Sequence, residues 1–167
     1  CALTKKMQDK IENLPNIREI LKNNNIKINK ALGQNFLFDL NITDKIVKKS
    51  NPIASTIIEV GPGPGSLTRS ILKNKSSVVY AIDKDFQSKA MLAELKMIYK
   101  NRLNIIIDDA LHYPIWKLGD APRQIIANLP YNVGTKMLVV WLKNIHKFDL
   151  LTLMFQKEVA DRIIAKP

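Results

Sequence analysis

Short apolar runs alternate with stretches of helical periodicity along most of this 167-residue chain. The apolar runs have the length of buried strands and lie at residues 56–60, 77–82, 103–107, 124–127 and 150–155. Apolar residues at helical spacing fill the intervals, over residues 66–73, 86–99, 135–144 and 156–165. This alternation predicts an α/β fold with a mostly parallel sheet and helices on both faces.

The first 50 residues follow a different pattern, in which no strand-like run occurs. A helix is expected after Asn13-Leu14-Pro15, because asparagine caps helices and proline suits a first turn. A second helix is expected from near Asp39 or Asn41, and the glycine-containing segment 30–37 joins the two. We therefore divide the chain into an N-terminal helical arm, residues 1–50, that leads into the site, and an α/β domain, residues 51–167.

A glycine-rich turn, Gly61-Pro62-Gly63-Pro64-Gly65, follows the first predicted strand. Glycine lets the main chain turn sharply and approach a ligand closely. The third glycine comes one residue too early for the dinucleotide pattern G-x-G-x-x-G, so a small nucleotide-like cofactor fits better than a pyrophosphate. Glu59 precedes the turn, where we expect its negative charge to suit a cationic ligand. A plain tight turn is the alternative.

Carboxylates end the second and third predicted strands. Asp83 lies about 20 residues after the glycines, where a carboxylate accepts hydrogen bonds from ribose hydroxyls. Asp109 is expected to accept a hydrogen bond from the amino group of a cofactor adenine, with the Ala110 main chain meeting a ring nitrogen. A helix cap at Asp83 and a solvated turn at Asp109 are the structural alternatives.

The fourth predicted strand ends in Asn128-Leu129-Pro130-Tyr131. Open α/β sheets bind ligands at the carboxyl ends of their strands, so this turn is expected beside the glycine turn. The Asn128 side chain and the Leu129 or Pro130 carbonyl offer two acceptors for the protons of an adenine amino group. Tyr131 offers a stacking surface, and such a contact contributes ~1–3 kcal/mol. The two turns together predict methyl transfer to an adenine amino group that is flipped out or unpaired.

The charge and composition of the chain indicate which kind of partner it binds and in which cellular compartment it works. The net charge of +11 favours nucleic acid, although a generally lysine-rich composition is the alternative explanation. The single cysteine, Cys1, permits no internal disulfide, and His112 and His146 are too far apart to suggest a metal site. We expect a cytoplasmic protein, because neither a secretory signal nor an apolar run long enough to cross a membrane is visible.

Several segments, in order, resemble the small-subunit ribosomal RNA adenine-N6 dimethyltransferases. The matching segments are LPNIRE at 14–19, KALGQNFL at 30–37, EVGPGPGSLT at 59–68, Asp83, DDAL at 108–111, NLPYNV at 128–133 and MFQKEVADRIIAKP at 154–167. Members of this family use S-adenosylmethionine to dimethylate two adjacent adenines of the small-subunit (16S) RNA. The resemblance implies a Rossmann-like methyltransferase fold over residues 51–167.

The resemblance also implies roles for single residues and partners for the protein. Asn128, Leu129, Pro130 and Tyr131 would hold the target base. The cofactor would be enclosed by Gln34, Asn35, Leu37, Glu59, Gly61, Gly63, Asp83, Asp109, Ala110 and Asn128. The implied partners are the small-subunit ribosomal RNA and the immature small subunit, in a role in ribosome maturation. We expect a monomer that needs no metal and no membrane.

The family's sequence continues beyond the point that matches Pro167, with further strands, an aromatic residue at the base site and a small helical domain. We therefore expect a catalytic domain truncated at its C-terminus, a sheet without its last two strands, and weak or no methylation by this piece alone. Two alternatives remain. One is a non-catalytic RNA-binding assembly factor on the same fold, and the other is a large-subunit ribosomal RNA adenine methyltransferase. A nicotinamide-dependent oxidoreductase is disfavoured by the glycine spacing.

Overall fold

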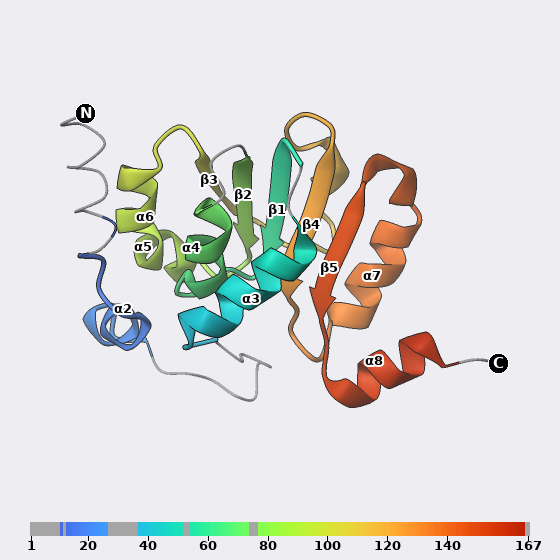
Figure 1. Cartoon of the computed structure of the whole chain (residues 1–167), viewed down its shortest axis with the longest axis horizontal. Coiled ribbons are helices and arrows are strands. Elements are labelled where there is room, and N and C mark those ends of the chain that lie inside the picture. The colour runs from blue at the N-terminus through green and yellow to red at the C-terminus, as the bar shows by residue number, and fades with distance from the viewer. Residues whose placement is uncertain (1–10, 12, 27–36, 52–53, 74–76, 166–167) are drawn as a thin grey trace.

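A five-stranded parallel sheet forms the centre of the molecule (Figure 1). The computed structural model describes residues 11, 13–26, 37–51, 54–73 and 77–165. The strands have the order β3-β2-β1-β4-β5. Their bounds are β1 (Thr56–Val60), β2 (Val78–Asp83), β3 (Leu103–Ile107), β4 (Arg123–Asn128) and β5 (Leu150–Met154). Each predicted strand is therefore confirmed to within two residues at either end.

The register brings the carboxyl ends of the strands to one edge of the sheet. Asp83 pairs with Ile107, and Asn128 pairs with Met154. This edge is the lower one in Figure 1, where the strand arrowheads point. The order reverses at β1, because the chain passes from β1 to β2 and β3 on one side and then to β4 and β5 on the other. Ligands of open α/β sheets bind at such a reversal point.

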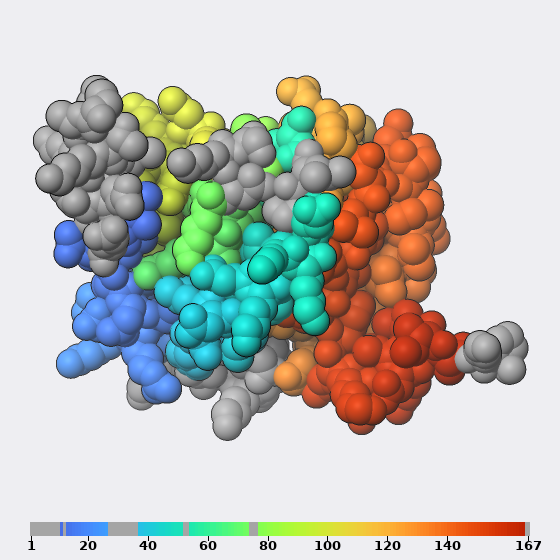
Figure 2. Space-filling view, viewed as in Figure 1, coloured from blue at the N-terminus to red at the C-terminus, as the bar shows by residue number. Residues whose placement is uncertain are grey.

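Helices cover both faces of the sheet, as predicted. Their bounds are α2 (Ile17–Asn23), α3 (Leu40–Ser50), α4 (Ser66–Leu72), α5 (Gln87–Met91), α6 (Ala93–Ile98), α7 (Gly134–Leu142) and α8 (Lys157–Ile164), with 3-10 turns η2 (Ile115–Lys117) and η3 (Ile145–Lys147). Side chains alternate along β1, so Ile57 packs with α3, α4 and α6 while Ile58 packs with α7 and η2. Figure 2 shows α3 and α4 covering the near face.

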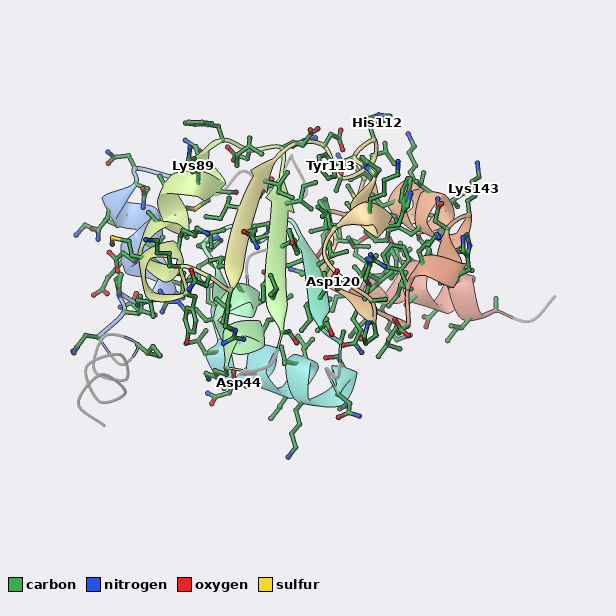
Figure 3. The ribbon with its side chains drawn as sticks, turned by 90° about the horizontal axis from the view of Figure 1, so that it is seen from above. Asp44, Lys89, His112, Tyr113, Asp120 and Lys143 are labelled. Atoms are coloured by element: carbon green, nitrogen blue, oxygen red, sulfur yellow. The ribbon has the colours of Figure 1, made fainter. Side chains whose placement is uncertain are left out.

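The view from above shows the two layers that cover opposite faces of the sheet (Figure 3). In Figure 3, Asp44 lies with α3 on one side of the sheet, and His112 and Tyr113 lie on the other. On the first side, Asp44 accepts hydrogen bonds from Ser70 and Lys73, both at 2.5 Å, and so ties α3 to α4. Burial is the largest single influence on the pKa of Asp44 and would raise it, but the hydrogen bonds from Lys73 and Ser70 and the charge of Lys73 together lower the pKa below its ordinary value.

The structure divides one predicted helix into two. Residues 86–99 were expected to form a single helix, but the structure breaks it at Leu92 into α5 and α6. Leu92 is completely buried and has φ −94° and ψ 0°, which lie outside the helical region. Helical periodicity continues across the break, so the apolar pattern alone does not reveal it. No helix among the described residues is long and apolar enough to cross a membrane.

Candidate active site

A cavity of about 560 Å³ lies at the carboxyl edge of the sheet. Its walls come from the ends of β1, β2 and β4 and from the turn after β3. The predicted site residues that line it are Gly61, Gly63, Asp83, Asp109, Ala110, Asn128, Leu129 and Pro130. The structure thus brings the glycine turn, both carboxylates and the Asn128 turn together in one cavity.

The glycine turn requires glycine for its conformation at two of the cavity positions. Gly61 has φ +67° and Gly63 has φ +50°, a left-handed region that costs other residues roughly 1–2 kcal/mol. The Gly61 amide donates to the Ile82 carbonyl at 2.9 Å, which fixes the turn against the end of β2. The turn then leads directly into α4 at Ser66. A main chain without side chains therefore forms this wall of the cavity.

The Asp83 carboxylate is held in place by its own loop. One oxygen accepts a hydrogen bond from the Ser88 hydroxyl at 2.6 Å, and the other accepts from the Asp85 amide at 3.0 Å. Burial raises the pKa of Asp83, and these hydrogen bonds oppose the rise because they favour the charged form. Asp83 is therefore an oriented acceptor in the cavity wall, with lone pairs left for a ligand hydroxyl.

Asp109 is oriented in a similar way at the end of β3. Its carboxylate accepts from the Leu111 amide at 2.9 Å. The Asp108 amide donates to the Asp83 carbonyl at 2.9 Å, so the ends of β2 and β3 stay adjacent. Asp83 and Asp109 thus stand on neighbouring strand ends that face one cavity.

Main-chain hydrogen bonds fix the turn that follows Asn128. The Leu129 amide donates to the Met154 carbonyl at 3.3 Å, and the Pro130 carbonyl accepts from Gly134 at 3.0 Å and Val133 at 3.4 Å. Two donors already occupy the Pro130 carbonyl, whose oxygen has two lone pairs. Of the two carbonyls left open by sequence reasoning, that of Leu129 is therefore the better acceptor for a ligand.

Glu59 differs from the expectation. It is 1% exposed, lies outside the cavity lining and contacts Thr68 of α4. Burial raises the pKa of Glu59 to about 8; Thr68 opposes this rise and the nearby Asp83 charge adds to it. Burial therefore favours the neutral form of Glu59 in the ligand-free chain. The attraction of its carboxylate for a cationic ligand stays a prediction.

Two other predicted residues, both described by the structure, do not line the cavity, and two more lie outside the described part of the chain. The Tyr131 side chain is 45% exposed and lies outside the lining, as does half-buried Leu37. Gln34 and Asn35 lie outside the described residues. The stacking role of Tyr131 and the enclosing roles of Gln34, Asn35 and Leu37 therefore stay predictions.

Other lining residues were missed from the sequence. They are Val60, Ile82, Lys84, Asp85, Met91, Leu111, Asn132, Val133 and Met137. Met91 and Met137 stand at apolar positions of helices, where a core role is the usual interpretation. Lys84 and Asp85 directly follow Asp83, and this proximity was the one available signal for them.

Comparison with known proteins gives a consistent result. The family model described as ribosomal RNA adenine dimethylase matches residues 25–167. Ribosomal RNA small subunit methyltransferase A of Rhodospirillum rubrum is 45% identical over 157 residues, covering 93% of this chain and 54% of that protein. The chain spans about half the length of the curated relatives it matches.

Solved structures agree with the fold. A dimethyladenosine transferase from Plasmodium falciparum has a TM-score of 0.64 and 28% identity, covering 79% of this chain and 47% of that one. The 23S rRNA methyltransferase ErmE has the same TM-score at 22% identity, covering 76% of this chain and 50% of that one, and this likeness concerns the fold alone. The family match and the curated relatives lead to one conclusion: the chain belongs to the ribosomal RNA adenine dimethylase family.

Proposed function

We propose that this chain holds the cofactor and target-base sites of an S-adenosylmethionine-dependent adenine-N6 dimethyltransferase. The substrate is two adjacent adenines of the small-subunit ribosomal RNA, and the modification supports maturation of the small subunit. One observation carries the proposal: Asp83, Asp109 and Asn128 line the same cavity from the carboxyl ends of β2, β3 and β4, on both sides of the glycine turn after β1. Family membership and the names of the curated relatives support the reaction and the RNA.

The residues of the cavity fit the cofactor. The oriented Asp83 carboxylate suits two ribose hydroxyls, and Asp109 suits an adenine amino group. The bare main chain at Gly61 leaves room for the methionine part, since a β-carbon there would extend toward Asn128. When bound, S-adenosylmethionine supplies a methyl group on a positively charged sulfur.

The Asn128 turn prepares the target base. An adenine amino nitrogen is a weak nucleophile because its lone pair is delocalised into the ring. The Asn128 side-chain oxygen and the Leu129 carbonyl accept the two protons of this group, which favours a pyramidal nitrogen with an available lone pair. Hydrogen bonds that strengthen as charge develops stabilise the transition state. No strong general base is required, because the proton leaves after transfer.

Charge supports an RNA partner for this site. The net charge of +11 raises the local concentration of a polyanion and speeds its association. The base must leave its stack to enter the cavity, so an unpaired segment of the RNA is the substrate. We expect the protein to act as a monomer on the immature small subunit in the cytoplasm.

Asn128→Ala tests the proposal in the full-length protein, with unmethylated small subunits as substrate. We expect dimethylation to fall by about 100-fold or more, as when a single transition-state hydrogen-bond donor is removed elsewhere. Asn144→Ala is the matched control, since the Asn144 side chain donates to the nearby Val140 carbonyl, and Asn144 follows the end of α7 whereas the cavity lies at its start. Undiminished dimethylation by the Asn128 variant would contradict the assigned role.

The full-length protein also distinguishes the proposed function from its two alternatives, a large-subunit RNA methyltransferase and a non-catalytic assembly factor. Methylation of large-subunit RNA in preference to small-subunit RNA would favour the large-subunit enzyme. Calorimetry that detects no binding of S-adenosylmethionine would favour a non-catalytic assembly factor.

A further inference from the structure

Met91 belongs to two parts of the molecule at once. It is the last residue of α5, is 4% exposed and lines the cavity at the sheet edge. It also packs in a separate apolar cluster with Ile17, Ile20 and Leu21 of α2. Figure 1 shows α2 beside α5 at one side of the molecule. One side chain therefore stands between the N-terminal arm and the proposed cofactor site.

The arm is fixed at the start of α2. The Arg69 guanidinium, buried in α4, donates to the Pro15 carbonyl at 2.6 Å. The Asn16 side chain accepts from the Glu19 amide at 3.0 Å, and the Glu19 carboxylate accepts from the Asn16 amide at 2.8 Å. This reciprocal cap sets where α2 begins, and Arg69 sets where it docks.

A second contact holds the other side of α2. The Arg18 guanidinium lies 5.1 Å from the centre of the Phe38 ring, and Phe38 packs against the cluster that contains Met91. A small cavity of about 50 Å³ adjoins this region and is lined by Pro15, Arg69 and Met91. Methionine has three rotatable bonds and fills irregular space, so its position depends on what packs against it.

We propose that docking of α2 positions Met91 in the cavity wall, so that docking of the arm and binding of the cofactor are coupled. Met91 is a positioning residue, and α2 acts on the site through it. Coupling of this kind is reciprocal, so a ligand in the cavity stabilises the docked arm as much as the docked arm stabilises the ligand. The inference rests on the proposed function for the identity of the ligand, S-adenosylhomocysteine being the stable probe.

Ile20→Ala tests the coupling without changing a residue that lines the proposed cofactor cavity. We expect the Kd for S-adenosylhomocysteine to rise by about 10-fold, within the usual range of coupling between sites. Leu103→Ala is the matched control, because it also shortens a buried aliphatic side chain but lies at the opposite end of β3 from the cavity. The control is expected to keep the Kd of the unaltered chain at a temperature where both variants are folded.

Hydrogen exchange of the unaltered chain provides the reciprocal measurement and needs no variant. We expect S-adenosylhomocysteine to slow exchange of the Ile20 amide in α2 and of the amide of Asn24, which caps the end of α2. Met91→Ala is expected to remove this protection, and Met91→Leu to restore most of it. Unchanged exchange in α2 with saturating ligand, or an unchanged Kd for Ile20→Ala, would overturn the coupling. Absence of binding by the unaltered chain would contradict the proposed function itself.

Discussion

Gly61 faces the main-chain oxygen of Asn128 across the sheet edge: a β-carbon added at Gly61 would lie 4.0 Å from that oxygen. The turn after β1 and the end of β4 are therefore direct neighbours, although 67 positions separate them in the sequence. This adjacency supports the proposed function, in which a cofactor on the glycine turn would lie within reach of a base held by Asn128.

Substitution of Gly61 by alanine is expected to weaken binding of S-adenosylhomocysteine by about 10-fold or more. The new methyl group occupies cavity space, and the left-handed conformation costs roughly 1–2 kcal/mol of stability. Calorimetry and thermal unfolding measure the two effects separately.

Gly119→Ala is the control for backbone strain. Gly119 also has a left-handed conformation, with φ +56°, and an added β-carbon would lie 2.3 Å from the Thr56 hydroxyl oxygen. This variant is expected to lose stability and to keep its affinity for S-adenosylhomocysteine, since Gly119 lies beside Thr56 at the amino end of β1, away from the cavity. If Gly61→Ala and Gly119→Ala lose affinity equally, backbone strain and not lost cavity space would be the cause of the weaker binding.

Asp83→Asn is expected to weaken cofactor binding by roughly 10- to 100-fold, because hydrogen bonds to a charged acceptor contribute about 1.5–3 kcal/mol. Ser88→Ala removes the 2.6 Å hydrogen bond that orients Asp83 and should have a smaller effect in the same direction. Exposed Asp120, in the loop before β4, provides the control Asp120→Asn. Wild-type affinity in Asp83→Asn would remove Asp83 from the ribose site.

Much of the site was predictable because strand ends are visible in a sequence. Gly61, Asp83, Asp109 and Asn128 each follow a short apolar run, and parallel strands place such residues on one edge. The periodicity does not show which way a side chain turns beyond the strand end. Tyr131 was expected to face the ligand; its side chain is 45% exposed and lies outside the cavity lining, so its stacking role stays a prediction.

The sequence also did not show which polar side chains are buried. Glu59 stands in a run of apolar residues next to a ligand-binding turn, and a carboxylate there suggests a ligand contact. The structure buries the Glu59 side chain beside Thr68 of α4. Met91 could not be recognised either, because an apolar residue of a helix is usually a core residue, and Met91 both packs in an apolar cluster and lines the cavity.

The buried Glu59 predicts a pH dependence of stability. Its pKa is about 8 in the folded chain and 4.5 ordinarily, so the folded state retains a proton that the unfolded chain loses between these values. Stability therefore falls as the pH rises from about 4.5 to about 8, by on the order of a few kcal/mol, and levels off above that. Urea unfolding at pH 5 and pH 8.5 measures the change.

Glu59→Gln is expected to remove most of this decline, because the amide stays neutral throughout. Glu158→Gln, an exposed position of α8, should keep the decline of the unaltered chain. If Glu59→Gln declines as steeply as the unaltered chain, burial of a protonated Glu59 is contradicted.

The most direct test of a shared cofactor and base cavity is a crystal structure of the chain with S-adenosylhomocysteine. We predict that the ribose hydroxyls lie within hydrogen-bond distance of Asp83 and the adenine amino group within that distance of Asp109. The sulfur should face Asn128 across the cavity. A ligand bound elsewhere, or bound with its sulfur directed away from Asn128, would contradict the proposed site.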